Sequence, residues 1–218
     1  MIDPGLGGRV VLITGANNPF GIGAAAARAF AAQGARVFLH YFRQPDARME
    51  GGVPSSPGES FYRVQQMKGV EELLRAIRTS GAKAEAWEAD LADAACVVPL
   101  FDEAERLLGP VEIVVNNAAH WEADTFIPSG ADLRNPLVQL WTDRPDPIRA
   151  RGADRLFEVN TRAPALIMAE FARRHVARGA SWGRIINVSF GRGAGLPLGD
   201  QLRCEQVRAR ELFEKRGG

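Results

Sequence analysis

Apolar and polar residues alternate along the chain in blocks whose lengths suit strands and helices. Residues 10–13 are four consecutive apolar residues, mostly β-branched, which predicts a short buried strand. A glycine-rich turn follows, and apolar residues then recur at helical spacing over 22–33. Residues 35–41 predict a second strand. Strand, glycine-rich turn, helix and strand together have the length of one βαβ unit.

The rest of the chain repeats this alternation. Further helices are expected over a segment that ends near residue 79, over 93–108 and over 152–178, and further strands over 82–88, 111–115 and 184–188. Between them, residues 44–60 and 120–150 contain many prolines and show no period, which predicts two long loops. Alternating strands and helices predict a parallel sheet that is covered on both faces and has right-handed crossovers.

The expected fold class is therefore α/β, a Rossmann-type doubly wound parallel sheet of about five strands with helices on both faces. At 218 residues the chain predicts a single domain. Ligands of such sheets bind beyond the carboxyl ends of the strands, at the point where the strand order reverses. Candidate functional residues are therefore sought at those strand ends.

Charge and composition narrow the function classes. Lys and Arg number 27 against 26 Asp and Glu, which gives no electrostatic reason to expect nucleic acid or an anionic membrane as partner. No apolar run reaches the ~18 residues of a membrane span, and no basic and then apolar leader begins the chain, so a cytoplasmic location is expected. Cys96 and Cys204 suit a reducing compartment. The three dispersed histidines lack metal-ligand spacing, so no metal site is expected.

The turn after the first strand carries the first chemical signal. It reads Thr14-Gly15-Ala16-Asn17-Asn18-Pro19-Phe20-Gly21-Ile22-Gly23. Glycines let the backbone turn tightly and approach a pyrophosphate, while the start of the next helix supplies N–H donors and a positive dipole end. The position between a strand and a helix favours phosphate binding over a plain turn.

Five motifs in register make the chain resemble the short-chain dehydrogenases/reductases over about residues 8–189. They are Thr14-Gly15 with Gly21-Ile22-Gly23, Asp90-Leu91, Asn116-Asn117-Ala118-Ala119, Val159-Asn160, and Arg184-Ile185-Ile186-Asn187-Val188-Ser189. The resemblance is to 3-oxoacyl-type reductases. It implies a homo-oligomeric oxidoreductase that uses a nicotinamide cofactor to reduce a ketone or 3-oxoacyl-type carbonyl of a small molecule.

The resemblance implies cofactor-binding roles at the ends of three strands. The residues are Gly15, Asn18, Gly21, Ile22 and Gly23 for the pyrophosphate, Asp90 and Leu91 for the adenine, and Asn117 and Ala118 for the ribose side. Five residues separate the first two glycines, where the family usually has three. For Asp90, the alternative role is that of a turn residue at the start of a helix.

The end of the second strand bears on the choice of cofactor. An acidic residue there would bind the adenosine ribose hydroxyls and repel a 2′-phosphate. This chain has Tyr41 at that place, followed by Phe42 and Arg43, with no acid nearby in the sequence. Because Arg43 could bind a phosphate with two parallel hydrogen bonds, NADP(H) is favoured over NAD(H).

The catalytic set departs from the family pattern of Asn, Ser, Tyr and Lys. Asn160 matches the Asn, but Phe190 stands at the position of the Ser. Ser189 is present, one residue earlier, and would face the other side of an extended strand. A Tyr-x-x-x-Lys pair, in which Tyr protonates the carbonyl and Lys lowers its pKa, occurs nowhere: Tyr41 precedes Pro45 and Tyr62 precedes Gln66 at that spacing.

Residues 190–218 match nothing in the family as written. Reading the last two bases of each codon with the first base of the next permits Glu-Ile-Ser-Tyr-Gly-Ala-Ser-Lys over 199–207, and Ser where Phe190 stands. We therefore expect a frameshift after Ser189 and a family chain truncated there. The tail is expected to be partly helical, the dimer helix to be missing, and the apolar strand 184–188 to lack a partner at its outer edge.

Two function classes compete with an active reductase. A nucleotide-binding fragment without catalysis is expected if no other group replaces the missing Tyr and Lys. An α/β methyltransferase is the other possibility, but the absence of an acid after the second strand and the Asn-Asn-Ala-Ala run argue against it.

Overall fold

The computed structural model describes residues 4–44, 59–122, 124–125, 146–190 and 202–205. The strands are β1 Val10–Ile13, β2 Arg36–Tyr41, β3 Ala84–Glu88, β4 Val111–Asn116, β5 Asp124–Thr125, β6 Asp146–Pro147, β7 Arg184–Phe190 and β8 Leu202–Glu205. Six of them form one sheet in the order β3-β2-β1-β4-β7-β8, and β5 pairs with β6 separately. In this sheet β3, β2, β1, β4 and β7 are parallel to one another, as predicted, and β8 runs antiparallel to β7.

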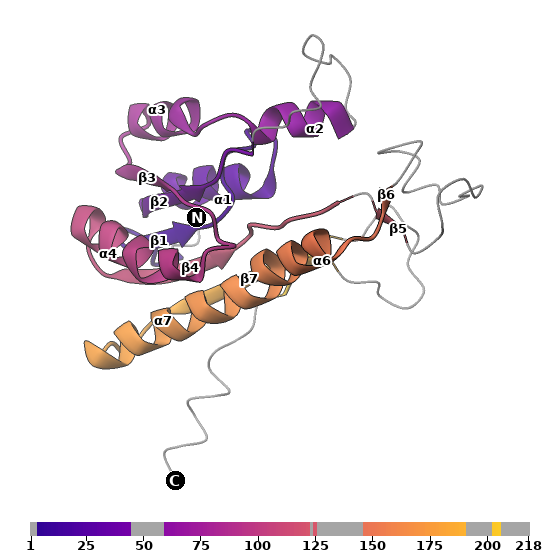
Figure 1. Ribbon diagram of the computed structural model, residues 1–218. Coiled ribbons are helices and arrows are strands. Elements are labelled where there is room, and N and C mark those ends of the chain that lie inside the picture. Colours follow the sequence, from indigo (N-terminus) through magenta and orange to yellow (C-terminus); the bar gives the residue numbers. More distant parts are fainter. Residues whose placement is uncertain (1–3, 45–58, 123, 126–145, 191–201, 206–218) are drawn as a thin grey trace.

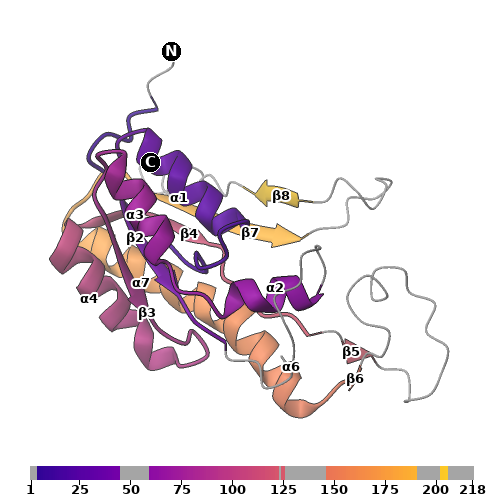
Figure 2. The same ribbon diagram turned by 90° about the horizontal axis from the view of Figure 1, so that it is seen from above.

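The helices cover both faces of this sheet (Figures 1 and 2). They are α1 Ile22–Ala32, α2 Glu59–Gln66, α3 Glu71–Thr79, the 3-10 turn η1 Ala94–Cys96, α4 Val97–Leu108, α6 Ala150–Phe157, the π-helical segment η2 Glu158–Arg162 and α7 Ala163–Ala177. No described helix is both long enough and apolar enough to cross a membrane. The chain turns from β1 to β2 and β3 on one side, and then returns to β4 and β7 on the other. The strand order therefore reverses between β1 and β4.

Two apolar cores lie on opposite faces of the sheet. One joins the alanines of α1 and the leucines of α3 to alternate residues of β1 and β2, such as Val11 and Leu39. The other joins α4 and α7 to the remaining residues of the same strands, such as Leu12 and Phe38. Because β1 is buried on both faces, its four residues form a continuous apolar run with no polar alternation.

Two helices differ from the sequence prediction at their interiors. The helix expected to end near residue 79 is two helices, α2 and α3, separated at residues 67–70. The Asn17 side-chain amide donates to the carbonyls of Gln66 and Lys68, at 2.9 and 3.2 Å, and so satisfies backbone groups that a continuous helix would bond internally. The helix expected over 93–108 begins with η1, whose N-cap Asp93 accepts from the Ala95 N–H at 2.9 Å.

The long helix expected over 152–178 is interrupted in its first half. It begins at Ala150 as α6, widens to a π-helix over 158–162, and continues as α7 to Ala177. Single π-turns within α-helices occur frequently at functional sites. Here the π-helical turn contains Asn160, the residue that the sequence assigned to catalysis.

The far edge of the sheet also differs from expectation. The outer edge of β7, expected to be unpaired, pairs with β8 from Asn187 opposite Glu205 to Phe190 opposite Leu202. Helix was expected in part of the tail, whereas the described residues 202–205 form this strand. The rest of that prediction lies outside the described residues.

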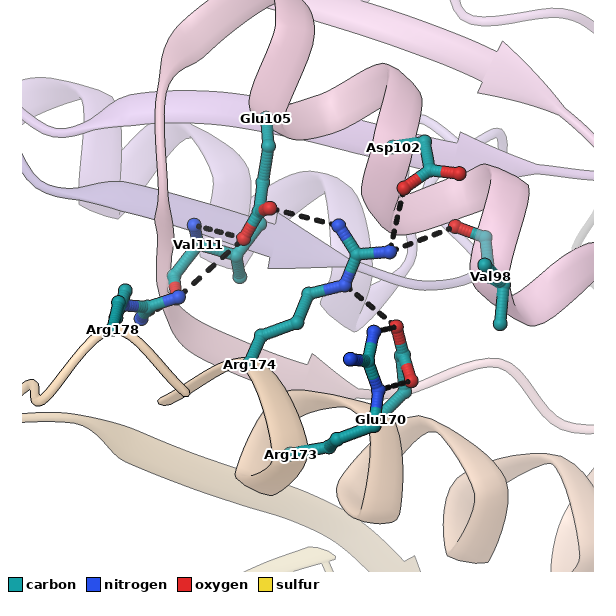
Figure 3. Close-up of polar contacts among 8 residues, drawn as sticks. All are labelled: Val98, Asp102, Glu105, Val111, Glu170, Arg173, Arg174 and Arg178. Carbon is teal, nitrogen blue, oxygen red and sulfur yellow. Dashed lines mark hydrogen bonds and ion pairs between the residues drawn. The ribbon is translucent and has the colours of Figure 1, made fainter. Parts of the chain in front are cut away.

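Charged side chains join α4 to α7, the two helices that pack on one face of the sheet (Figure 3). Arg174 donates to Asp102, Glu105 and Glu170 at 2.6, 2.8 and 2.6 Å. Arg173 donates two further hydrogen bonds to Glu170, at 2.6 and 2.7 Å. The side chains of Arg174 and Glu170 are only 13% and 9% exposed. Hydrogen bonds from Arg173 and Arg174 lower the pKa of Glu170 to about 2, so this carboxylate stays charged inside the contact.

Candidate functional site

The glycine-rich turn packs against the end of β4 with no room for side chains. Gly15 has a φ of +70°, and a Cβ built on it would lie 2.7 Å from the Ala118 Cα. A Cβ on Gly23 would lie 2.5 Å from the Gly15 carbonyl oxygen and 2.6 Å from Asn117 Nδ2. Glycine at both positions lets the two strand ends and the start of α1 meet closely. The structure thus places Gly15 and Gly23 in a tight backbone junction, and their predicted contact with a pyrophosphate stays a prediction.

Thr14 and Asn117 fasten this junction with uncharged hydrogen bonds. The Thr14 hydroxyl accepts from the backbone N–H groups of Asn117 and Ala118, both at 3.0 Å. Asn117 Nδ2 donates to the carbonyls of Thr14 and Gly15, both at 2.9 Å. The side-chain amide of Asn117 holds the turn, and its expected place on the ribose side of a cofactor stays a prediction. Thr14 was not among the predicted site residues, although it begins the glycine motif.

The N-terminus of α1 opens toward the junction without a side-chain cap. Its N-cap is Gly21, and neither a capping side chain nor an acidic residue occurs in its first turn. The Gly21 N–H donates to the Asn18 carbonyl at 2.9 Å, and Asn18 Oδ1 accepts from the Phe20 N–H at 3.0 Å. These bonds shape the five-residue segment between Gly15 and Gly21. The backbone N–H groups at the start of α1 therefore remain a site for an anion.

These elements enclose a cleft of about 300 Å³ at the carboxyl ends of the strands. The residues that line it come from the glycine turn, the ends of β2 to β4, α2 and α6; they are Gly15, Asn17, Asn18, Gly21, Ile22, His40, Phe42, Gln44, Tyr62, Gln66, Asp90, Leu91, Asn117, Ala118, Ala119, His120, Arg155 and Val159. The cleft lies where the strand order reverses, as predicted for a ligand site. Most of the predicted cofactor residues lie in its wall; Gly23, Tyr41 and Arg43 do not.

Sequence reasoning did not select Asn17, whose side chain joins several segments of the cleft wall. Besides the two carbonyls near the end of α2, its Nδ2 donates to the Phe42 carbonyl at 3.2 Å. One amide thereby joins the glycine turn, the segment after β2 and the end of α2. The position of Asn17 inside the glycine motif was the available signal, but its partners depend on tertiary structure.

The region after β2 corrects one sequence interpretation. No acid was found near Arg43 in the sequence, yet β3 lies beside β2 and brings Glu88 to it. Arg43 Nε lies 2.9 and 3.0 Å from the two Glu88 carboxylate oxygens, and its Nη2 lies 2.5 Å from one of them. The bonds from Arg43 hold the pKa of Glu88 below its usual range. Arg43 is therefore already paired with a carboxylate, outside the cleft wall.

Asp90 is held by an arginine that sequence reasoning did not select. Arg155 of α6 donates from Nη1 and Nη2 to the two Asp90 oxygens, at 3.0 and 3.1 Å. Asp90 Oδ1 also accepts from the Ala92 N–H at 3.0 Å, which matches the alternative turn role of this residue. The Arg155 guanidinium lies 5.6 Å from the centre of the Phe42 ring. Arg155 thus links α6 to two sides of the cleft.

His40 contributes an uncharged imidazole to the cleft wall. His40 is 1% exposed, and its ring Nε2 lies 2.9 Å from the Ala89 carbonyl oxygen. Burial lowers the pKa of His40 to about 4, so the ring is neutral at physiological pH. His40 therefore adds no positive charge for a ligand phosphate.

Asn160 and His120 are joined by a pair of reciprocal hydrogen bonds. The His120 N–H donates to Asn160 Oδ1 at 2.7 Å, and Asn160 Nδ2 donates to the His120 carbonyl at 2.8 Å. The His120 ring contacts Glu122 at 2.9 Å and Gln44 at 3.4 Å. The structure thus couples the π-helical segment to the residue that follows the Asn-Asn-Ala-Ala run. The predicted catalytic role of Asn160 stays a prediction.

Ser189, the doubtful catalytic candidate, lies on β7, and Tyr62, which no Lys follows at the family spacing, lies on α2. Ser189 is exposed on β7 and is not among the residues that line the cleft. Tyr62 lines the cleft from α2, and burial raises its pKa above the ordinary value. The residue four positions after Tyr62 is Gln66, which cannot supply the positive charge that a Lys would place there. The described residues hold no Tyr and Lys at the family spacing.

The chain matches a protein family over more than half its length. Residues 60–197 match the model of the short chain dehydrogenases. A short-chain type dehydrogenase/reductase of Picea abies is 33% identical over 184 residues, which are 84% of this chain and 54% of that protein. The chloroplastic NADPH-dependent aldehyde reductase 2 of Arabidopsis thaliana is 34% identical over 185 residues, which are 84% of this chain and 56% of that protein.

A solved structure shows the same likeness in three dimensions. A metagenomic short-chain oxidoreductase in complex with NADP superposes with a TM-score of 0.59 at 26% identity. The likeness covers 88% of this chain and 66% of that one. The chain thus spans somewhat more than half of the length of the two plant relatives.

Proposed function

Because the chain belongs to the short-chain dehydrogenase family, we propose that its cleft is built to bind NADP(H) for the reduction of a ketone or 3-oxoacyl-type carbonyl. The main support is the uncapped N-terminus of α1 beside glycines that no side chain could replace. A pyrophosphate needs both features, since its oxygens accept from backbone N–H groups at close range. The residues present therefore fit a dinucleotide.

Three observations support NADP(H) over NAD(H). An NAD(H) site would have an acidic residue at the end of β2. In this chain Tyr41 ends β2 and Phe42 follows it. An arginine, Arg155, lines the cleft near Phe42. The Arabidopsis relative is described as NADPH-dependent, and the similar solved structure is a complex with NADP.

Calorimetric titration of the chain with NADPH and with NADH, at one fixed salt concentration, tests the binding proposal. We expect NADPH to bind more tightly, because a charge-assisted contact to its extra phosphate contributes roughly 1.5–3 kcal/mol before screening. Failure of both nucleotides to bind would reject the proposed function of the cleft. Equal affinities would reject only the cofactor preference.

For the printed sequence we expect cofactor binding without turnover. A bound nicotinamide would supply a hydride to the carbonyl carbon, and the carbonyl oxygen would need a proton from a side chain of the cleft. Asn160 carries an amide that is already bonded to the His120 backbone and is not an acid. Without a Tyr-x-x-x-Lys pair, the loss from general acid catalysis alone is roughly 10²–10⁴-fold.

An assay of NADPH oxidation with a panel of small ketones tests this expectation. The matched variant replaces the residues from Phe190 onward with the shifted-frame sequence, continued to the family's full length, which restores the Ser, Tyr and Lys of the family. We expect turnover by that variant and none by the printed chain. Steady turnover by the printed chain that Asn160→Ala abolishes would show that another residue donates the proton.

We also propose a cytoplasmic protein that self-associates through α6 and α7. Phe157 on α6 and Val176 on α7 are 59% and 68% exposed, so a second copy that covers these helices would remove their apolar side chains from water. Sedimentation of the purified chain over a concentration series would show a dimer or larger species. A monomer at every concentration would contradict the proposal, and Phe157→Glu with Val176→Glu should remove any association observed.

A further inference from the structure

A hydrogen-bonded bridge crosses the cleft between the segments that follow β2 and β4. Gln44 follows β2, and its side-chain Nε2 lies 3.4 Å from His120 Nδ1. His120 follows β4, and its ring Nε2 lies 2.9 Å from Glu122 Oε1. Gln44 and His120 both line the cleft. Since β2 and β4 are the two neighbours of β1 in the sheet, the bridge joins strand ends that lie roughly 10 Å apart, with the end of β1 between them.

One neutral form of the His120 ring satisfies both contacts. An ionised Glu122 carboxylate can only accept a hydrogen bond, so His120 Nε2 carries the proton. The amide nitrogen of Gln44 can only donate, so His120 Nδ1 is the unprotonated acceptor. The His120 side chain is only 10% exposed, so little water competes for these bonds. Each end of the bridge therefore has the donor or acceptor that its partner needs.

Both ends of the bridge are fixed to the surrounding structure. The Gln44 backbone N–H donates to the Gln66 carbonyl at 3.3 Å, and the Asn17 side chain donates to the same carbonyl at 2.9 Å. At the other end, the backbone of His120 is held by the two hydrogen bonds with Asn160. The bridge therefore holds the two walls of the cleft at a fixed separation.

The cleft is narrow for the ligand proposed above. Its volume of about 300 Å³ is at the lower end of the range for pockets that bind drug-sized ligands, about 300–1,000 Å³. A dinucleotide, with two nucleosides and a pyrophosphate, is larger than most such ligands. The two walls must therefore move apart for it to bind. The contact between Gln44 and His120 is a direct obstacle to that movement.

We propose that the Gln44–His120 bridge holds the cleft closed and opens to admit the dinucleotide. This inference rests on the proposed function of the cleft. Binding then replaces a hydrogen bond between the walls by contacts with the ligand, so the bridge slows entry and lowers affinity. Because the bridge is made by protein side chains alone, it restrains NADPH and NADH alike. It therefore acts on nucleotide access and not on the choice between the two cofactors.

A double-mutant cycle, measured by stopped-flow binding of NADPH and NADH, tests the proposal. The proteins are the original chain, Gln44→Leu, His120→Leu, the double variant, and Gln33→Leu as a control at the exposed end of α1. We expect each single variant at the bridge to raise both association rate constants roughly 3- to 10-fold, the range for loss of one neutral hydrogen bond. Dissociation should change by less than roughly 2-fold, since the bridge is open in the complex.

The double variant decides whether the bond itself carries the effect. We expect it to match the single variants, because all three remove the same contact, whereas additive effects would mean that Gln44 and His120 act separately. Unchanged association in both single variants would show that the walls separate without breaking the bond. Equal rises in association and dissociation would show that the bond re-forms over the bound nucleotide, which also contradicts the proposal. Gln33→Leu should change neither rate, and melting temperatures show which variants remain folded.

Nitrogen NMR of the histidine rings tests the bridge without depending on affinity. We expect the His120 ring of the original chain to carry its proton on Nε2. Addition of NADPH should shift the Nδ1 resonance in the same direction as Gln44→Leu does, since both remove the bond from Gln44. A proton on Nδ1 would overturn the bridge itself. If neither nucleotide binds to the original chain or to the bridge variants, the proposed function fails, whatever the state of the ring.

Discussion

The cleft and the α4–α7 contact both keep polar side chains away from water, but they satisfy them by different means. In the cleft, the uncharged Thr14, Asn17 and Asn117 bond backbone groups of neighbouring turns. Between α4 and α7, the ionised Arg174 and Glu170 bond each other and further acids. The first arrangement leaves the field of the α1 N-terminus and of Arg155 available to a ligand. The second joins the two helices that cover one face of the sheet.

The difference also sets opposite requirements for protonation. His40 in the cleft wall is stable only as the neutral imidazole, because its burial disfavours the charged form. Glu170 in the α4–α7 contact is stable only as the carboxylate, because Arg173 and Arg174 bond it. The cleft wall therefore requires one neutral side chain, that of His40, whereas the α4–α7 contact requires the ionised side chain of Glu170. Substitutions and changes of pH should therefore affect the stability contributed by the two regions differently.

Removal of the central cation of the ionic contact should give the largest effect. Arg174→Met leaves Glu170, Glu105 and Asp102 without their shared partner, and a broken buried pair costs about 3–5 kcal/mol. The measurement is the free energy of unfolding from urea titration. The control is Arg106→Met on the exposed face of α4, where the pair with Glu103 should matter little. Equal losses for both variants would show that the contact contributes no more than a surface pair.

The pH dependence of stability should show two windows. His40 has a folded pKa of about 4, below its ordinary 6.5, so the unfolded chain takes up its proton first as pH falls. This group should therefore remove about 3 kcal/mol of stability between pH 6.5 and 4. Glu170, with a folded pKa of about 2 against an ordinary 4.5, should remove stability between pH 4.5 and 2.

Urea titrations across the pH range, with one variant for each window, test this assignment. His40→Gln should flatten the profile between pH 6.5 and 4 and leave the lower window unchanged. Glu170→Gln should flatten the lower window alone. A profile in which neither variant changes the slope of its own window would contradict the link between these two groups and acid stability.

A smaller effect is expected from the closest backbone approach in the cleft. Gly15→Ala adds a Cβ that would lie 2.7 Å from the Ala118 Cα, on a backbone with positive φ. Gly81→Ala is the matched control, because Gly81 also has positive φ but its Cβ would meet nothing within 4 Å. We expect Gly15→Ala to cost about 1–3 kcal/mol more than the control in urea unfolding. Equal losses in the free energy of unfolding for the two variants would mean that the turn can relax to accept a Cβ at Gly15. The proposal that the turn must be tight to bind a pyrophosphate would then be wrong.

The sequence predicted the parallel strands, their order of appearance and the glycine turn well. These features are local: a β-branched run such as residues 10–13 and the glycines at 15, 21 and 23 carry their structural meaning within a few residues. The motifs shared with the family also predicted the fold class. The helix interruptions at residues 67–70 and 158–162 escaped, because helical periodicity continues across both. The pairing of β8 with the outer edge of β7 was also not predicted.

The polar partners of the site could not be read from the sequence in the same way. Glu88 reaches Arg43 because β3 pairs with β2 in a register that places Glu88 opposite Tyr41. Arg155 reaches Asp90 from a helix 65 residues later in the chain. Both pairs depend on strand order and helix placement, which no local pattern encodes. The nearest sequence signal for Arg155 is its position on the helix that carries Asn160.

Hydrogen–deuterium exchange of the chain with and without NADPH tests the central claim most directly. The claim is that the dinucleotide binds between the α1 N-terminus and Arg155, away from the ionic contact. We predict slower exchange on NADPH addition over residues 15–23, 90–92 and 117–120, and unchanged exchange in α4 and in the second half of α7. Protection confined to other segments, or no protection with NADPH at saturating concentration, would contradict it.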